Sequence, residues 1–524
     1  MNRLSVALPG AAFAGRLALG GFTALGAGSG KLSGADTIGY HEVRLDAGKK
    51  LVPWCGSSPG EAYDHVIRKV WSFWITMRNC PNGVPYYLLH QVWKPDRDDP
   101  RGLGGDQISM ALSSWNLLYG YLGDRAVHEN MRRIADYWID HGMAPSNLLW
   151  GDLPYPYNST STSGAYDGDM RAGLGYLQPD KAASFGAELV TLYKISGERR
   201  YLEVATRVAD RLVQRVERGD AENSPWPFRV HAATGRIHEE RNDRDHRLYR
   251  ASYTSNWTGA LRLFTDLATL GEGNADRYRG TARLVEAWLK AYPLKNNRWG
   301  PFFEDVSTKD YSDTEINADT LAAYILEHPE WGPDGPADAR RILDWSYRTF
   351  ANPQAERWGV VVINEQTQFP VPGNSHTARH AATELLLAEK TGETAGRDAA
   401  IRRLSWSTYA VDDDGRNRYP GDDIWLTDGY GDFVRHYLRA MASDPELAPP
   451  FQNHLLRSSS VIRSIAYGRS AIRYEKFDPD SEEVFRLGAA APLGAKGASL
   501  SWDPARRLLR VASHARAVTV TLSP

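Results

Sequence analysis

The stretch from Trp150 to Lys181 combines aromatic rings with charged side chains and has neither helical nor strand periodicity. The rings are Trp150, Tyr155, Tyr157, Tyr166 and Tyr176, and the charged residues between them are Asp152, Asp167, Asp169, Arg171, Asp180 and Lys181. A loop of this length inside a compact domain is usually functional or disordered, and disordered segments are poor in aromatic residues. Rings beside carboxylates and cations suit a polar ligand with apolar faces, such as a sugar. The alternative is a surface loop that its tyrosines hold in place.

Pairs of carboxyl groups are the first chemistry that the sequence offers. Hydrolysis of a glycosidic bond needs one carboxylic acid and one carboxylate on opposite sides of that bond. The candidates are Asp106, Asp152, Asp169, Glu365 and Asp428, with Asp167 and Glu304 as further loop carboxylates. Asp106 follows two glycines at a predicted helix start, where the helix dipole favours an ionised carboxylate, although it could serve only as a helix cap. We predict Asp106 as the base of an inverting hydrolysis, with the acid supplied by Glu365 or by the 150–181 loop.

The alternative chemistry is β-elimination on a uronic acid, which begins with removal of the α-proton. It needs a cation or amide that neutralises the substrate carboxylate, and a tyrosine or histidine that removes the α-proton. The residues that could provide these groups are Tyr253, Asn256, His376, Arg379, His380 and Tyr430, and the trio Arg171, Lys181 and Arg379 would suit an anionic glycan. The histidines could instead be buried residues at a helix start. Carbohydrate binding without catalysis, through rings such as Tyr155, Tyr157 and Tyr166, is the third class.

Two classes of predicted helix alternate along the chain and must position these side chains. Amphipathic helices with one charged face are expected at 61–78, 126–141, 199–216, 276–291, 337–351 and 397–410. Helices poor in charge and rich in Ala, Leu, Gly and Ser follow Asp106, Asp180, Thr254, Asn317, His376 and Asp428. Low-charge helices are buried on most sides, whereas amphipathic helices face water on one side. Six buried helices surrounded by six amphipathic helices form a closed double ring of helical hairpins.

This pattern resembles the (α/α)6-barrel, or six-hairpin toroid, of many glycoside hydrolases and polysaccharide lyases. The resemblance spans residues 61–445 and rests on the alternation of helix classes and on turn phrases such as Leu122-Gly123-Asp124, Ser196-Gly197-Glu198 and Thr391-Gly392-Glu393. The inner helices of such a ring run the same way, so their N-termini open onto one face. The resemblance implies a polar basin on that face, rimmed by the tyrosines of the 150–181 loop, in which the candidate residues meet.

The two ends of the chain differ from the helical region. Residues 1–30 are small, apolar and nearly uncharged, which is typical of a secretory signal, so we expect a secreted or periplasmic protein, with a cytoplasmic one as the alternative. A Gly/Ser-rich segment at 31–60 leads into a catalytic barrel at 61–450. Residues 451–524 contain alternating runs such as RLLRVAS and AVTVTLS, which predict a small antiparallel β-domain.

Charge and motifs exclude several classes of function. The formal net charge of −2 at pH 7 gives no electrostatic basis for binding nucleic acid or an anionic membrane. No dinucleotide fingerprint, phosphate loop or His/Cys metal spacing is present, so no cofactor or metal is expected; only VDDDGRNRYPGDD at 411–423 has the alternating carboxylates of a calcium loop. Cys55 and Cys80 either form one disulfide or remain two separate thiols. A carbohydrate is the expected partner.

Overall fold

The computed structural model describes residues 36–81, 83–89, 105–157, 165–241, 246–302, 312–417 and 429–523, with the backbone alone at residues 106 and 429–432. The predictions for the signal segment, Glu304 and Asp428 therefore lie outside the described residues, as do the predictions for the side chains of Asp106 and Tyr430. Thr37–Pro524 forms one compact unit that contains both the helices and the C-terminal sheets. The predicted domain boundaries at residues 30, 60 and 450 remain predictions.

Six helices form a closed inner ring. They are α3 (Gly105–Leu122), α5 (Pro179–Ser196), α7 (Thr258–Leu270), α10 (Glu315–Glu327), α12 (Asn374–Thr391) and α14 (Gly429–Ser443). Each of them packs against the next one along the chain, and α14 packs back against α3. Nearly every residue of α5 and α10 is buried, as expected for inner helices that are packed on most sides.

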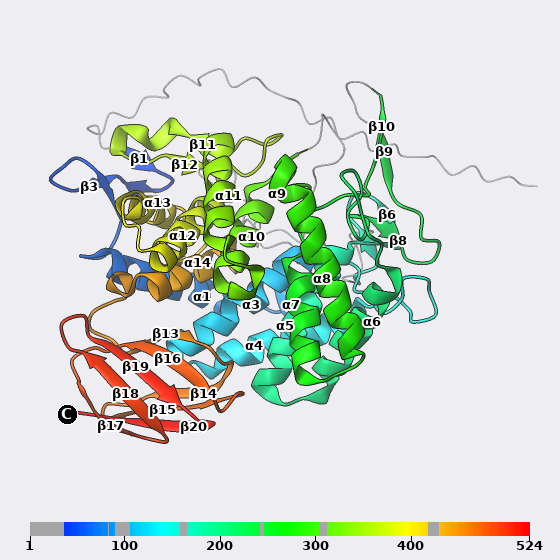
Figure 1. Cartoon of the computed structure of the whole chain (residues 1–524). Coiled ribbons are helices and arrows are strands. Elements are labelled where there is room, and N and C mark those ends of the chain that lie inside the picture. Colours follow the sequence, from blue (N-terminus) through cyan, green and yellow to red (C-terminus); the bar gives the residue numbers. More distant parts are fainter. Residues whose placement is uncertain are drawn as a thin grey trace, which may run out of the picture. The chain divides into compact units, whose positions relative to one another are not determined.

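Six outer helices pack around the inner ring (Figure 1). They are α1 (Pro59–Thr76), α4 (Arg125–His141), α6 (Arg199–Arg215), α8 (Ala275–Ala291), α11 (Gly335–Phe350) and α13 (Arg397–Thr408). In α6, Tyr201, Leu202, Ala205, Val208 and Leu212 are buried at helical spacing, which leaves the charged residues on the opposite face. The fold is the predicted (α/α)6 toroid. The prediction of an amphipathic helix at 397–410 is wrong, because residues 403–408 of α13 are all buried.

Shorter elements connect the hairpins. The short helices are α2 (Tyr86–Leu89), α9 (Pro293–Asn296), η1 (Pro329–Trp331), η2 (Pro353–Trp358) and η3 (Pro445–Leu447). Six two-stranded ribbons pair β1 (Thr37–Ile38) with β2 (His41–Glu42), β3 (Arg44–Leu45) with β4 (Leu51–Val52), β5 (Gly168–Asp169) with β6 (Gly173–Leu174), β7 (Tyr176–Leu177) with β8 (Val230–His231), β9 (Glu239–Arg241) with β10 (Leu248–Arg250), and β11 (Ala351–Asn352) with β12 (Val362–Ile363). The 150–181 stretch thus contains three short strands that its sequence pattern did not predict.

Three inner helices begin two or more residues from the predicted positions: α7, α10 and α12, the last of which begins at Asn374 and not at His376. The sequence places the start of α7 at Tyr253–Asn256, but the helix begins at Thr258, because the preceding side chains bind other segments: the Thr254 hydroxyl donates to the Pro301 carbonyl oxygen (2.7 Å). Helix α10 begins at Glu315, two residues before the predicted Asn317. The Thr314 hydroxyl oxygen caps it by accepting a hydrogen bond from the Ile316 N–H (3.2 Å).

Helices α5 and α7 are in close contact at Gly259. A Cβ atom at this position would lie 2.4 Å from Ser184 Oγ and 2.7 Å from Ser184 Cα. We expect Gly259→Ala to lower the free energy of unfolding by about 1–3 kcal/mol, because the added methyl group overpacks this contact. The matched control is Gly280→Ala on α8, where a Cβ meets nothing within 4 Å and helix propensity should add about 0.5–1 kcal/mol. Urea unfolding measures both changes, and equal changes in the two variants would contradict this account of the packing.

Two four-stranded antiparallel sheets follow the ring. One has the strand order β13 (His454–Ser458), β16 (Ser481–Arg486), β19 (Leu508–Ser513), β18 (Ala498–Asp503), and the other β14 (Ile462–Tyr467), β15 (Ala471–Lys476), β20 (Ala517–Leu522), β17 (Pro492–Lys496). They pack on the inner helices through β13, which contacts α3 and α14, and β14, which contacts α3 and α5. One direct link is the hydrogen bond from Arg463 Nε to the Lys194 carbonyl oxygen (2.9 Å). The predicted antiparallel β-domain is therefore confirmed.

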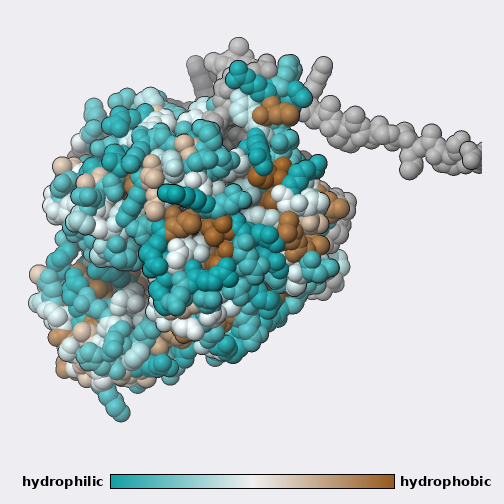
Figure 2. Space-filling view, turned by 45° about the vertical axis from the view of Figure 1, so that its right-hand side comes forward, coloured by the Kyte–Doolittle hydropathy of each residue, from teal (hydrophilic) through white to brown (hydrophobic). Residues whose placement is uncertain are grey.

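The surface matches the pattern of the outer helices. The face shown in Figure 2 is mostly hydrophilic, with hydrophobic residues confined to separate patches. Among the described residues, no helix has the length and hydrophobicity needed to cross a lipid bilayer. Cys55 and Cys80 are both free thiols, which decides between the two alternatives for these cysteines.

Candidate functional site

Lys181 lies in the first turn of α5 at the centre of a buried polar network. Its Nζ atom binds Asp180 Oδ2 (2.8 Å) and the Phe302 carbonyl oxygen (2.7 Å), and only 1% of the residue is exposed. Asn256, directly before α7, donates its side-chain amide to the same Asp180 oxygen (2.8 Å). The network therefore joins two of the predicted substrate-binding residues, Lys181 and Asn256, through a carboxylate at the N-terminal ends of neighbouring inner helices.

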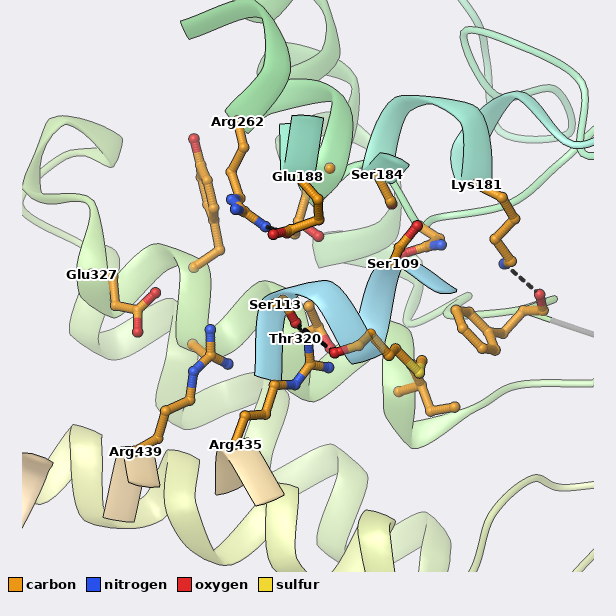
Figure 3. Close-up of a pocket in the computed structure, with 18 residues that line it drawn as sticks. Ser109, Ser113, Lys181, Ser184, Glu188, Arg262, Thr320, Glu327, Arg435 and Arg439 are labelled. Atoms are coloured by element: carbon orange, nitrogen blue, oxygen red, sulfur yellow. Dashed lines mark hydrogen bonds and ion pairs between the residues drawn. The ribbon is translucent and has the colours of Figure 1, made fainter. Parts of the chain in front are cut away.

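A cavity of about 100 Å³ runs from this network between the inner helices. It is lined by residues of α3, α5, α7, α10 and α14, including Lys181 and Asn256. Figure 3 shows Lys181 at one end of the cavity and Glu327 and Arg439 at the other. Most of the lining is polar or charged, with Met110, Phe302 and Ile316 as apolar contacts near the Lys181 end. An interior of this composition suits a small polar ligand.

Glu315, His376 and Arg379 form a buried cluster where α10 and α12 begin. Glu315 Oε2 lies 2.8 Å from His376 Nδ1 and 2.6 Å from an Arg379 guanidinium nitrogen. Ile316, which lines the cavity, directly follows Glu315 in α10, whereas Glu315, His376 and Arg379 are not among the residues that line it. Burial lowers the pKa of His376 below its usual value, which makes the neutral imidazole the main form near pH 7. Burial also raises the pKa of Glu315, against the opposing effect of the Arg379 charge.

A second buried cluster lies one helical turn further along the same two helices. His380 Nδ1 binds Asp319 Oδ2 (2.7 Å), and His380 Nε2 lies 3.5 Å from Glu384 Oε1. Glu384 also contacts Arg403 of α13. Burial alone would lower the pKa of His380, but the two carboxylates raise this pKa to about 10. The imidazole is therefore charged at neutral pH. Both ring nitrogens face a carboxylate, so we assign His380 a structural role.

Several rings in the described residues of the 150–181 stretch pack into the protein core. Tyr157 and Tyr166 are only 8% and 3% exposed, and the Tyr166 ring lies 5.9 Å from Trp138 of α4. Tyr155 is half-buried, and its carbonyl oxygen accepts a hydrogen bond from the Trp138 indole (3.0 Å). The sequence predicts that these rings rim the site, but the structure uses them mainly to fix the loop against α4. Burial of this kind leaves little ring surface for a sugar.

The loop carboxylates bind partners that have structural roles. Asp169 is fully buried and binds Arg229 (3.1 Å), the Gln178 amide and the backbone N–H groups of Arg171 and Ala172. Its pKa lies below the usual value, because these partners outweigh the effect of burial. Asp152 binds Arg211 (3.2 Å) of the outer helix α6. Because ion pairs fix both carboxylates, we leave them out of the chemistry proposed below.

The remaining candidates lie around the same face. Arg171 binds Glu240 (3.4 Å), and the Tyr253 hydroxyl donates to the Arg298 carbonyl oxygen (2.9 Å). Glu365 is buried beside the start of α10, where the Thr314 hydroxyl donates to its carbonyl oxygen (3.3 Å). In the part of the chain that the structure describes, no group of three or more His, Cys, Asp or Glu residues is arranged to hold a metal ion.

Two carboxylates that the sequence interpretation missed, Glu315 and Asp319, are the ones that bind the histidines. They are four residues apart on α10, and His376 and His380 are four residues apart on α12, so one face of each helix presents two partners in register. A search for matched i, i+4 pairs on neighbouring inner helices could have found them. Predicting the start of α10 at Asn317 placed Glu315 outside the helix.

Comparisons with solved structures show what the fold is similar to. No family model and no curated protein matches the chain. The cellobiose 2-epimerase from Spirochaeta thermophila DSM 6192 is 13% identical at a TM-score of 0.56, with 74% of this chain and 96% of that chain covered. The cellobiose 2-epimerase from Bacillus thermoamylovorans B4167 is 12% identical (TM-score 0.53; 73% and 99% covered), and a sugar epimerase from a ruminal bacterium is 11% identical (0.52; 72% and 98%). The chain thus shares its toroid fold with carbohydrate-processing enzymes.

Proposed function

We propose that this protein is a carbohydrate-active enzyme that moves a proton at the carbon next to a carbonyl or carboxyl group of a sugar, with His376 as the base. The observation that carries the proposal is the buried contact between Glu315 and the Nδ1 atom of His376 where α10 and α12 begin. A carboxylate at Nδ1 holds the hydrogen on that nitrogen and leaves Nε2 as the proton acceptor. His376 Nε2 makes no hydrogen bond to the residues that the structure describes.

The surrounding charges suit this step. Removal of a proton next to a carbonyl group places negative charge on the carbonyl oxygen, and a nearby cation stabilises that charge. Arg379, which binds the same Glu315 oxygen as His376, is the residue that we assign to this role. A neutral imidazole is required as the base, and the lowered pKa of His376 provides it at neutral pH.

Two reactions begin with this proton transfer. Return of the proton to the other face, or to a neighbouring atom, gives an epimerase or isomerase, and loss of a leaving group from the next carbon gives the β-elimination of a lyase. Of these two reactions we favour epimerisation, because the similar solved structures at TM-scores of 0.52 to 0.56 are named as epimerases. We therefore favour proton transfer over the two-carboxylate hydrolysis that the sequence analysis favoured.

Hydrolysis remains the second candidate, and one carboxyl group supports it. Burial raises the pKa of Asp313 to about 6, a value that suits a general acid. Asp313 precedes α10 and lies beside the segment that carries Glu365, since its backbone N–H donates to the Thr367 hydroxyl (3.1 Å). Asp313 and Glu365 would then be the two carboxylates to test by substitution.

A product screen separates these reactions. The protein is incubated with neutral disaccharides, reducing monosaccharides and uronic-acid-containing glycans, and the products are followed by chromatography, ultraviolet absorbance and reducing-end assay. We expect a reducing sugar to be converted to an epimer or ketose, with no new reducing ends. An unsaturated uronate would instead identify the elimination branch of the same proton transfer. New reducing ends without either product would contradict the proposal and favour hydrolysis.

A further inference from the structure

A glycine lies directly against the imidazole of His376. Gly373 is the N-cap residue of α12 and precedes its first residue, Asn374. A Cβ atom built on Gly373 would lie 2.2 Å from His376 Cδ2, 3.0 Å from Cγ and 3.3 Å from Cβ. Non-bonded carbon atoms pack at about 3.5–4.0 Å, so no side chain fits at residue 373 while the ring keeps its place.

The backbone of Gly373 does not need a glycine for its conformation. Its φ and ψ angles of −102° and 133° lie in the extended region, which any residue adopts. The glycine also makes no side-chain hydrogen bond to the start of the helix, as a serine or an aspartate would. What the glycine provides is therefore the space for the His376 ring.

Hydrogen bonds hold the backbone of Gly373 on both sides. Its N–H donates to the Ile363 carbonyl oxygen of β12 (3.0 Å), and its carbonyl oxygen accepts from the Thr377 N–H (2.9 Å). The Thr377 hydroxyl oxygen also accepts a hydrogen bond from the Ile363 N–H (3.0 Å), which joins α12 to β12. A side chain at residue 373 would therefore displace the imidazole and leave the backbone in place.

Displacement of the ring would affect both of its nitrogen atoms. Glu315 binds Nδ1 at 2.8 Å, and Cδ2, the ring atom closest to Gly373, is bonded to Nε2. We infer that Gly373 is a positioning residue, because its lack of a side chain leaves the space in which the His376 imidazole binds Glu315 with Nε2 as the proton acceptor. The effect on catalysis rests on the proposed function, whereas the position of the ring does not.

Gly373→Ala tests the inference, with Gly396→Ala as the matched control. Gly396 is the N-cap residue of α13, it too makes no side-chain hydrogen bond to its helix, and a Cβ there meets nothing within 4 Å. Both variants make the same change at a helix start. Only Gly373→Ala places a methyl group against His376.

Turnover separates this inference from the proposed function. With His376 as the base, Gly373→Ala should reduce kcat by roughly 10²-fold, because a shift of about 1 Å in a reacting group has an effect of this size. Gly396→Ala should keep the wild-type kcat. A displaced ring together with a wild-type kcat in Gly373→Ala would support the positioning role of Gly373 and contradict the assignment of His376 as the base.

Nitrogen NMR of the full-length protein with isotope-labelled histidine shows the state of the ring directly. The signals of His376 are identified by their absence from His376→Asn. At neutral pH we expect the wild type and Gly396→Ala to carry the ring hydrogen on Nδ1, which Glu315 binds. In Gly373→Ala the contact with Glu315 is lost, so hydrogen should appear on Nε2. Identical His376 signals in Gly373→Ala and the wild type would overturn the inference.

A double-mutant cycle on thermal unfolding tests the same contact without any substrate. Gly373→Ala should lower the melting temperature by roughly 2–4 °C more than Gly396→Ala does, because the methyl group overpacks a closed contact. In a His376→Ala background the ring is absent, so the two alanine substitutions should have equal effects. The same loss from Gly373→Ala in both backgrounds would show that the methyl group does not meet the His376 ring, and would overturn the inference.

Discussion

Substitution of His376 by asparagine is expected to reduce kcat by roughly 10²–10⁴-fold while the protein remains folded, because the variant loses the proton acceptor. The asparagine amide can still donate to Glu315, as His376 Nδ1 does at 2.8 Å, so the buried carboxylate keeps a partner. Initial rates on the substrate found in the product screen measure the loss, and the melting temperature checks the fold. A matched control is His328→Asn, which removes an imidazole that binds Glu330 after α10 and should leave kcat unchanged.

The pH dependence of the wild-type enzyme gives an independent test of the same residue. Burial lowers the pKa of His376 in the folded protein, and the base must be neutral to act. We therefore expect kcat/KM to be small in acid, to rise through one ionisation below pH 6.5, and to level off at neutral pH. Full activity of His376→Asn, or a rate that falls as pH rises through this range, would remove His376 from the mechanism.

Substitution of His380 by asparagine should have the largest effect on stability. The charged imidazole lies between Asp319 and Glu384, at 2.7 and 3.5 Å, and its removal leaves the buried Asp319 carboxylate without this cation, whereas Glu384 keeps Arg403. Breaking a buried pair in this way costs about 3–5 kcal/mol of unfolding free energy. Urea unfolding at pH 7 measures the difference between the variant and the wild type. A loss below about 1 kcal/mol would contradict the assignment of His380 to a buried ionic cluster.

The sign of the pH effect follows from the direction of the pKa shift. The pKa of His380 is about 10 in the folded protein and about 6.5 in the unfolded chain. Its charge therefore stabilises the fold fully below pH 6.5, and this contribution is lost as pH rises through about 10. The stability difference between wild type and His380→Asn should accordingly shrink between pH 7 and pH 10. A difference that grows over this range would show that the imidazole is neutral in the folded protein.

The toroid could be predicted from the sequence because the amino-acid composition of a helix depends on how much of the helix is buried. A helix that is buried on all sides, such as α5, cannot carry many charges, whereas α6 keeps charges on one face. Six alternations of these two patterns leave few other arrangements. The starts of α7 and α10 were displaced by a few residues, because side chains such as Thr254 bind distant segments that local sequence does not reveal.

The site was harder to predict because its contacts depend on the register between helices. Glu315 and His376 are 61 residues apart, and whether they meet depends on how α10 lies against α12. The tyrosines of the 150–181 loop raise a related difficulty. A ring in a loop is equally suited to a ligand and to the core, and only the position of Trp138 shows that Tyr166 is part of the core. Sequence therefore indicated which helix starts carry the candidate residues more reliably than the contacts between those residues.

Exchange of substrate hydrogen with solvent tests the central claim most directly. The enzyme is incubated in D₂O with the sugar that it converts, and proton NMR follows the hydrogen on the carbon next to the carbonyl or carboxyl group. Proton transfer through His376 predicts that deuterium replaces this hydrogen at a rate comparable to turnover, and that His376→Asn abolishes the exchange. Conversion of the sugar with full retention of the original hydrogen, by an enzyme that His376→Asn leaves unaffected, would contradict the account.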